Sequence, residues 1–371
     1  MKKTNATKII VLVAVLVIAA TAAVGLYWQL DAPQTPQAST AAPTATQPTQ
    51  LTEPTAPTET VPEETIPAET VPAVDWGNKV ASIEKKVYVP PEGTLEVSKR
   101  WEGALSWHSN TADNYFVYDL NRDVYRIRSA SEDTILYPAS ITKLFTAYTA
   151  LQCVPADMQI TAGSELSFVI QFSSVAEIKS GDTLTVEQLV AAMLLPSGND
   201  AAYVLAVGVG RELAGDPELS KEEAVACFIA RMNEEAEKAG MTGSHFVTPD
   251  GIHDDNHYIS MRDFITVGRL AIENEIIAKY ASAAKWTITT AEGKTMAWLN
   301  SNLLLQPEEW FQCKQALGLK TGYTTPAGYC LLSYIKVGER DLLIGVFGCD
   351  TADDRFADTV LLLNQVFEKT P

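Results

Sequence analysis

The feature that most constrains this chain is a lysine three residues after a serine, at the start of an apolar helical segment. Ser140 and Lys143 belong to Pro138-Ala-Ser-Ile-Thr-Lys143. The residues that follow repeat apolar side chains at helical spacing, at Leu144, Ala147, Tyr148 and Leu151. This pattern predicts a buried helix that carries serine and lysine one turn apart on one face. Burial lowers the pKa of a lysine amine, and a neutral amine can take the proton of a neighbouring hydroxyl.

The serine and lysine can therefore form a nucleophilic pair without histidine, although the same spacing also fits a helix N-terminus with a solvated lysine. Two more segments bear on this choice. Ser197-Gly-Asn199 follows the apolar stretch Leu189–Leu195, and Lys320-Thr-Gly322 closes the stretch Gln315–Leu319. Taken singly, the first could be a helix cap and turn and the second a strand end. As an ordered set with S-x-x-K, they favour catalysis.

S-x-x-K, S-D-N and K-T-G, in this order, are shared by class A β-lactamases and penicillin-binding proteins. From about Tyr115 to about Glu368 the chain resembles the low-molecular-mass D-alanyl-D-alanine carboxypeptidases, and further matching residues are Asn233, Asn300-Ser-Asn302 and Gly322–Cys330. The resemblance implies a serine-type hydrolase that removes the terminal D-alanine of peptidoglycan stem peptides and is covalently inhibited by β-lactams. We expect no cofactor.

The resemblance also implies roles for the residues of S-x-x-K and S-G-N. Ser140 attacks the penultimate carbonyl, and Lys143 is the base, its pKa lowered by burial and by Lys320. Ser197 relays a proton to the leaving amine, and Asn199 holds Lys143 and the substrate amide.

The strand after S-G-N completes the implied site. The backbone N–H groups of Ser140 and Tyr323 form the oxyanion hole. Lys320 and Thr321 receive the terminal carboxylate, and Gly322 lets the substrate backbone approach. Arg355 adds positive charge there, unless it is a helix-start residue paired with Asp353 or Asp354.

The strand and helix patterns predict an α+β fold, an antiparallel sheet built from both chain ends with a mostly helical lobe inserted between them. Strand-like runs lie at Tyr115–Leu120, Val124–Arg128, Gln315–Lys320, Tyr329–Lys336 and Asp341–Gly348. Helical patterns lie at Leu189–Leu195, after a capping box of Thr185 and Gln188, at Lys221–Ala239, at Ser260–Asn274 and after Arg355. The resemblance implies the same β-lactamase/transpeptidase-like architecture, with Ser140 at the junction.

The N-terminal part predicts export from a bacterial cytoplasm. Residues 9–27 form an apolar run preceded by Lys2, Lys3 and Lys8, long enough to span a bilayer with residues 1–8 in the cytoplasm. The alternative is a cleaved signal peptide with its site at Ala20-Thr-Ala22, which would give a secreted protein. We favour a single-pass membrane anchor. Residues 28–78 read as a disordered, proline- and threonine-rich linker, 79–112 as a lead-in, and 113–371 as an extracytoplasmic catalytic domain.

Net charge and the spacing of histidines and cysteines exclude other functional classes. A net charge of −18 argues against nucleic-acid binding. His253 and His257 flank two aspartates but lack an H-E-x-x-H pattern, so we expect no metal site. The five cysteines show no C-x-x-C spacing, and their odd number leaves at least one unpaired within the chain.

Two rival hypotheses remain open. A class A β-lactamase has aspartate in the middle of S-D-N and a glutamate in E-x-x-L-N, whereas this chain has Gly198 and Met296 at those positions. The other rival is a non-catalytic, β-lactam-sensing or wall-binding protein. Intact Lys143, Ser197 and Lys320 argue against an inactive site.

Overall fold

The computed structural model describes residues 111–367, except 130, 308 and 310. The predicted cytoplasmic segment, the anchor, the linker and the lead-in up to residue 110 lie outside the described residues, so these assignments stay predictions. In the part that is described, no helix has both the length and the apolar character that crossing a bilayer requires.

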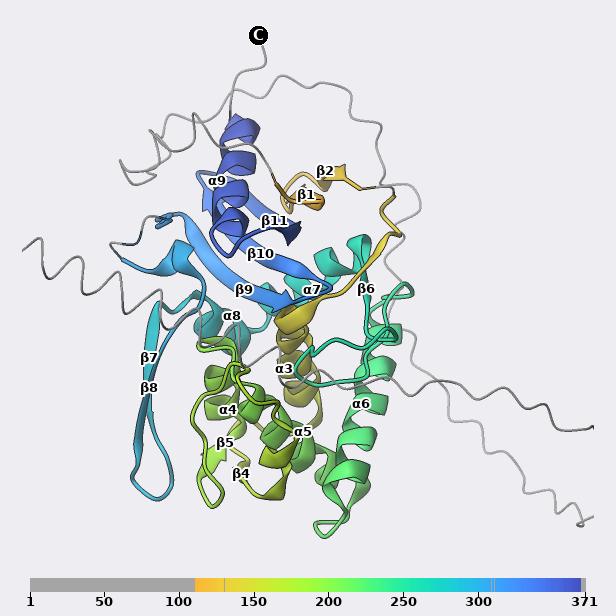
Figure 1. Ribbon diagram of the computed structural model, residues 1–371, viewed down its shortest axis with the longest axis vertical. Helices are drawn as coiled ribbons and strands as arrows, with labels where there is room; N and C mark the ends of the chain where they lie inside the picture. Colours follow the sequence, from red (N-terminus) through yellow and green to blue (C-terminus); the bar gives the residue numbers. More distant parts are fainter. Residues whose placement is uncertain (1–110, 130, 308, 310, 368–371) are drawn as a thin grey trace, which may run out of the picture. The chain divides into compact units, whose positions relative to one another are not determined.

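A five-stranded antiparallel sheet carries the fold, and both ends of the described chain contribute to it (Figure 1). Its order is β2-β1-β11-β10-β9, which places β9 at one edge. Neighbouring strands pair over most of their length, for example Tyr115 opposite Val346 and Lys320 opposite Leu332, and the register of β10 shifts locally between Tyr329 and Leu331 and between Ser333 and Ile335. The strands are β1 (Asn114–Asp119), β2 (Val124–Arg128), β9 (Ala316–Thr324), β10 (Gly328–Val337) and β11 (Arg340–Cys349). The predicted sheet is confirmed.

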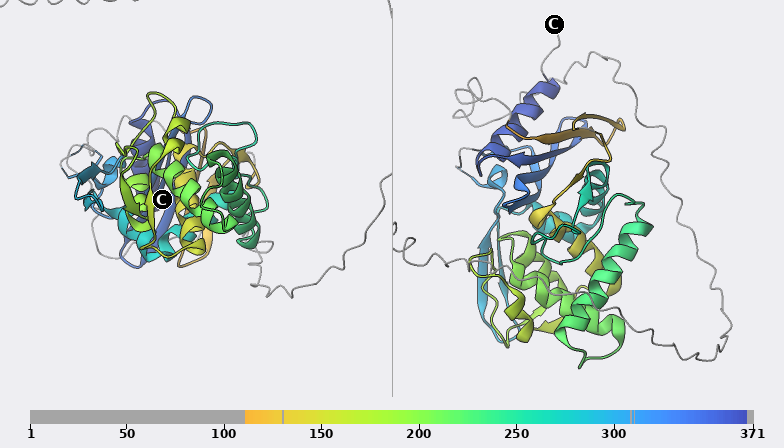
Figure 2. Two further views of the ribbon diagram at one scale, coloured as in Figure 1. Left: turned by 90° about the horizontal axis from the view of Figure 1, so that it is seen from below. Right: turned by 45° about the vertical axis from the view of Figure 1, so that its right-hand side comes forward.

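The two faces of the sheet are covered by different parts of the chain. Along β11, alternate side chains point to opposite faces. Leu343 and Phe347 join the core shared with the inserted helices, whereas Ile344 and Val346 join a smaller core under α9 (Asp354–Phe367). Figure 2 shows α9 lying along one face and the helices on the other side of the sheet.

The inserted lobe is mostly helical. Its first long helix, α3, is preceded by a short 3₁₀ turn, η1, and the capping box predicted at Thr185 and Gln188 is present at the start of α4. The helices are α3 (Thr142–Cys153), α4 (Val186–Leu194), α5 (Asn199–Ala214), α6 (Lys221–Lys238), α7 (Met261–Glu273) and α8 (Glu275–Ser282). The 3₁₀ turns are η1 (Ala139–Ile141), η2 (Ser164–Phe168) and η3 (Leu303–Leu305).

Three two-stranded ribbons complete the lobe. They pair β3 (Ile135–Leu136) with β6 (Ile259–Ser260), β4 (Gln159–Thr161) with β5 (Thr183–Thr185), and β7 (Lys285–Thr289) with β8 (Thr295–Leu299). The β7–β8 ribbon projects from the lobe as a long hairpin (Figure 1).

The lobe and the sheet meet where η1 packs against β9. A Cβ at Gly322 would lie 3.0 Å from the carbonyl oxygen of Pro138 and 3.1 Å from Cβ of Ala139. Only glycine allows the turn and the strand to approach this closely. The contact places Ser140 at the junction, as predicted.

Candidate active site

Lys143 and Ser140 form the centre of the site. Lys143 is completely buried, and its Nζ lies 2.7 Å from Oγ of Ser140 and donates to the carbonyl oxygen of Asp250 at 2.6 Å. Burial lowers the pKa of Lys143 to about 8, against the opposing attraction of the Asp250 and Asp200 carboxylates. The amine can therefore lose its proton near neutral pH while it touches the hydroxyl.

Lys320 is a second buried amine. Its Nζ donates to the carbonyl oxygen of Thr321 at 3.1 Å. Burial, followed by repulsion from Lys143 and Arg355, lowers its pKa well below the ordinary value. The predicted repulsion between the two amines lowers the pKa of Lys320, while the carboxylates of Asp250 and Asp200 favour the charged form of Lys143 and oppose the effect of burial there.

A loop from Val247 to Gly251 packs against the S-x-x-K turn and supports it. Beyond the Asp250 carbonyl, it supplies the carbonyl oxygen of Pro249, which accepts from Oγ1 of Thr146 at 2.7 Å. Gly251 has φ +80°, and a Cβ there would lie 1.9 Å from the carbonyl oxygen of Ala139. Glycine is required at that position for both reasons.

His257 connects this loop to α3. Its Nδ1 accepts from the backbone N–H groups of Val247 and Thr248, each at 3.2 Å, so Nε2 carries the hydrogen and donates to Oγ1 of Thr142 at 2.9 Å. Burial lowers the pKa of His257 to about 3, which keeps the ring neutral. Both ring nitrogens are thus occupied, and within residues 111–367 as described no set of three acidic, histidine or cysteine side chains could hold a metal.

Ser197-Gly-Asn199 forms the turn between α4 and α5. Ser197 and Asn199 are buried, Ser197 has φ +66°, and the N–H of Asn199 donates to the carbonyl oxygen of Ser174 at 2.8 Å. Lys143 bonds to Ser140 and Asp250, and no hydrogen bond to Asn199 is present among the described residues. The predicted hold of Asn199 on Lys143 stays a prediction.

Asp200 is a structural residue that the sequence reasoning missed. Its buried carboxylate accepts from the backbone N–H groups of Ala176 and Ile178 at 2.8–3.0 Å and so ties the preceding loop to the start of α5. A Cβ at Gly198 would lie 2.8 Å from Oδ1 of Asp200 and 2.7 Å from the carbonyl oxygen of Ala192. The aspartate of an S-D-N motif has no room here. The signal in the sequence was an acid in the first turn of a helix.

The remaining predicted residues gather along β9. Thr321 Oγ1 lies 2.7 Å from Oγ of Ser301, a contact that was not predicted. Tyr323 is 49% exposed and stacks on Tyr329. Arg355 donates from Nη1 to the carbonyl oxygen of Gly322 at 3.2 Å.

The guanidinium of Arg355 also lies over the rings of Tyr329 and Phe356. Burial lowers its pKa. Among the described residues it forms no ion pair with Asp353 or Asp354, which were its alternative partners. Arg355 is thus the second residue of α9, and its side chain contacts the K-T-G strand instead of pairing with an aspartate at the start of that helix.

Comparison with known proteins agrees with this arrangement. The sequence model of the D-alanyl-D-alanine carboxypeptidase family matches residues 106–351. The chain belongs to this family. A D-alanyl-D-alanine carboxypeptidase from Streptomyces is 30% identical over 246 residues, covering 63% of this chain and 80% of the relative. The carboxypeptidase DacF of Bacillus subtilis is 25% identical over 237 residues, but only 57% of its length is covered, against 63% of this chain.

Solved structures of similar proteins share the fold. The crystal structure of a Streptomyces DD-transpeptidase matches with a TM-score of 0.62 at 27% identity, covering 70% of this chain and 98% of that one. A penicillin-binding protein from Listeria monocytogenes in its cefotaxime-bound form matches with a TM-score of 0.56 at 26% identity, covering 70% and 99%. The transpeptidase-like fold class predicted from the sequence is confirmed.

Proposed function

We propose that this protein is a serine-type D-Ala-D-Ala carboxypeptidase that trims peptidoglycan stem peptides on the extracytoplasmic side of a bacterial membrane. The observation that carries the proposal is the buried amine of Lys143, with a pKa of about 8, at 2.7 Å from Oγ of Ser140. A hydroxyl next to an amine that is partly neutral at working pH is an activated nucleophile.

In acylation, neutral Lys143 accepts the proton of Ser140 as Oγ attacks the carbonyl carbon of the penultimate D-alanine. The negative charge on the carbonyl oxygen is stabilised by the backbone N–H groups of Ser140 and Tyr323. Lys143 returns the proton through Ser197 to the leaving amine, the C–N bond breaks, and D-alanine departs. Because Ser197 makes no side-chain hydrogen bond within the described residues, its hydroxyl is available for this transfer.

The terminal carboxylate of the substrate binds at Lys320 and Thr321. A carboxylate placed next to the Lys320 amine favours its protonated form, so substrate binding offsets the lowering of its pKa by burial and repulsion. Nη1 of Arg355 donates to the carbonyl oxygen of Gly322, so the charge of its guanidinium lies beside the strand that carries Lys320 and Thr321. We assign Arg355 to positioning the K-T-G strand and to supplying positive charge behind it.

In deacylation, water takes the space that D-alanine has left and hydrolyses the ester with Lys143 as base. β-Lactams acylate the same serine, but their leaving group stays tethered and blocks the water. Two residues weigh against the β-lactamase alternative. An aspartate does not fit at Gly198. Met296, which stands in the sequence where the E-x-x-L-N pattern has its glutamate, is a buried apolar side chain on β8.

The test is release of D-alanine from Nα,Nε-diacetyl-L-lysyl-D-alanyl-D-alanine by the full-length protein in detergent. We expect turnover by the wild type and none by Ser140→Ala. In parallel, intact-mass spectrometry after brief exposure to penicillin should show a lasting adduct on the wild type and none on the variant. Persistent labelling without D-alanine release would favour the non-catalytic, β-lactam-sensing alternative. Rapid loss of the adduct with steady penicillin hydrolysis would favour a β-lactamase.

A further inference from the structure

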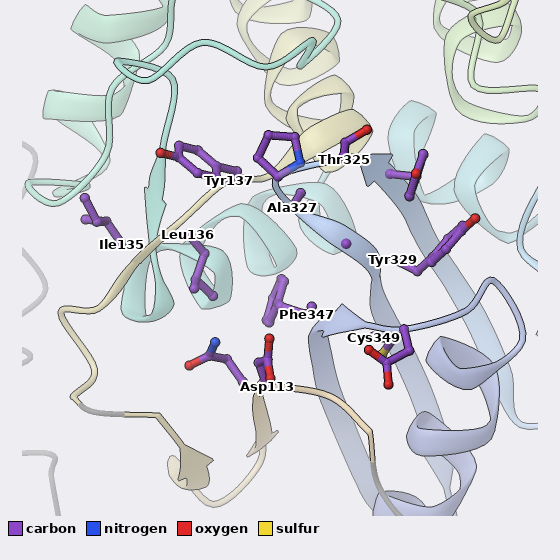
Figure 3. Close-up of a pocket in the computed structure, with 15 residues that line it drawn as sticks. Asp113, Ile135, Leu136, Tyr137, Thr325, Ala327, Tyr329, Phe347 and Cys349 are labelled. Carbon is purple, nitrogen blue, oxygen red and sulfur yellow. The ribbon is translucent and has the colours of Figure 1, made fainter. Parts of the chain in front are cut away.

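A pocket of about 520 Å³ opens at the end of the sheet where β9 turns into β10 (Figure 3). It is lined by the β9–β10 turn, the start of β1, the end of β11 and the segment Ile135–Tyr137. In Figure 3, the side chains of Asp113, Leu136, Tyr137, Thr325 and Tyr329 surround it from these separate segments. The roles assigned above to the catalytic residues do not use this pocket.

The pocket begins next to the nucleophile. Tyr137 stands three residues before Ser140 and lines the pocket. Tyr323, whose N–H is assigned to the oxyanion hole, also lines it. Tyr323 follows Gly322, where a Cβ would lie 3.3 Å from the backbone nitrogen of Ser140. A group bound to Ser140 therefore lies next to the pocket.

The order of the assigned binding residues along β9 sets the direction in which the substrate peptide runs. Lys320 and Thr321 take the terminal carboxylate, and the N–H of Tyr323 takes the oxygen of the reacting carbonyl. The acyl part of the peptide therefore continues past Tyr323 towards Thr325. An extended chain advances about 3.3 Å per residue, so the residue before D-Ala-D-Ala reaches the pocket. This step rests on the proposed function.

The lining of the pocket is acidic and aromatic. Asp113 and Asp350 are exposed carboxylates that make no hydrogen bond or ion pair within the described residues, and none of the fifteen lining residues is lysine, arginine or histidine. Asp113 is held over the backbone of β11, because its Oδ2 lies 2.9 Å from where a Cβ of Gly348 would be. Tyr323, which stacks on Tyr329 at 4.2 Å between ring centroids and is half exposed, adds an aromatic ring that also attracts cations, whereas the ring of Tyr329 already carries the guanidinium of Arg355.

We propose that this pocket binds the side-chain ammonium group of the diamino acid that precedes D-Ala-D-Ala in the stem peptide. The lining offers the carboxylates of Asp113 and Asp350 to a free ammonium group. In a cross-linked peptide the same nitrogen is an uncharged amide with a second chain attached. The enzyme therefore selects stem peptides that are not cross-linked through this amine.

The experiment compares two substrates of the full-length protein that differ only at this nitrogen: Nα-acetyl-L-lysyl-D-alanyl-D-alanine and its Nε-acetylated form. Two partly exposed ion pairs predict a preference for the free amine of about five- to tenfold in kcat/KM for D-alanine release. Because exposed charges are screened, the preference should shrink as salt is raised from about 0.05 M to 0.5 M.

Variants test whether the preference for the free amine arises in this pocket. Asp113→Asn with Asp350→Asn should abolish the preference while leaving turnover of the Nε-acetyl peptide unchanged, and Asp350→Asn alone should reduce it. Glu237→Gln is the matched control, since it removes one exposed carboxylate from α6 in the helical lobe and should leave the preference intact.

Equal turnover of both peptides by the wild type would overturn the inference and leave the proposed function standing. A preference that survives the double substitution would overturn the assignment to this pocket. If neither peptide releases D-alanine, the proposed function fails and this inference fails with it.

Discussion

At the scale of single residues, the proposed chemistry rests on one buried amine. Lys143 could be identified from the sequence because an apolar helical pattern predicted burial for a charged side chain. Its partner Asp250 could not, because the carbonyl that accepts from Lys143 lies 107 residues away in the chain and belongs to a loop without a periodic pattern. The contact of Ser301 with Thr321 and the bonds from Asp200 to the preceding loop were not predicted for the same reason, since the sequence around a residue does not show which distant segment it will contact.

The pKa of Lys143 predicts how acylation depends on pH. Below a pKa of about 8 the amine is mostly protonated and cannot accept the serine proton. The neutral fraction falls about tenfold for each pH unit below that value. The second-order rate of penicillin labelling should therefore rise with pH between about 6 and 8 and level off above. Stopped-flow labelling at constant ionic strength measures it.

Lys143→Arg is the companion variant. Guanidinium stays protonated throughout this range, so labelling should fall by orders of magnitude and lose its inflection near pH 8. A wild-type rate that is flat from pH 6 to 8, or a fast arginine variant, would mean that another group acts as the base.

At the scale of elements, the bounds of the strands and the long helices could be predicted from the sequence to within a few residues, whereas the segments that connect them could not. The alternating runs became β1, β2, β10 and β11, and the helical run from Lys221 became α6. The expected strand at Gln315–Lys320 extends to Thr324 as β9, because pairing with β10 continues through the K-T-G segment. The helix α5 was not predicted as an element, and neither was the β7–β8 hairpin.

The loop under the S-x-x-K turn supplies a prediction at this scale. Gly251→Ala forces a Cβ against the carbonyl of Ala139 at a φ of +80°. We expect it to cost roughly 3 kcal/mol or more in unfolding free energy and to slow penicillin labelling, because the turn that holds Ser140 must shift. Urea denaturation and labelling rates measure both effects.

Gly293→Ala is the control for that substitution. Gly293 has nearly the same backbone angle, φ +84°, but its added Cβ meets nothing within 4 Å. It should cost about 1–2 kcal/mol from the backbone alone and leave labelling unchanged. Equal losses of stability in the two variants would show that the close approach of loop and turn is unimportant.

At the scale of the whole molecule, the predicted anchor and linker set where the catalytic domain works. We propose that residues 9–27 remain in the protein as a single-pass anchor and that the linker holds the domain outside the membrane.

Peptide mapping of the protein from its native membrane should therefore recover peptides close to Met1, and high salt should not release the protein. A mature N-terminus just after Ala20 or Ala22 would instead establish a cleaved signal peptide and a secreted enzyme.

The position of β9 at the rim of the sheet has a stereochemical consequence. A peptide that lies against this strand as a further strand is held through its main chain, so recognition depends little on the identity of most of its side chains. Inverting the configuration at one α-carbon, however, exchanges the side chain with the hydrogen and turns a methyl group towards the strand or its neighbours. We therefore expect strictness about handedness at the last two residues of the peptide and, apart from the ammonium group assigned to the pocket, tolerance of side-chain chemistry further along the stem.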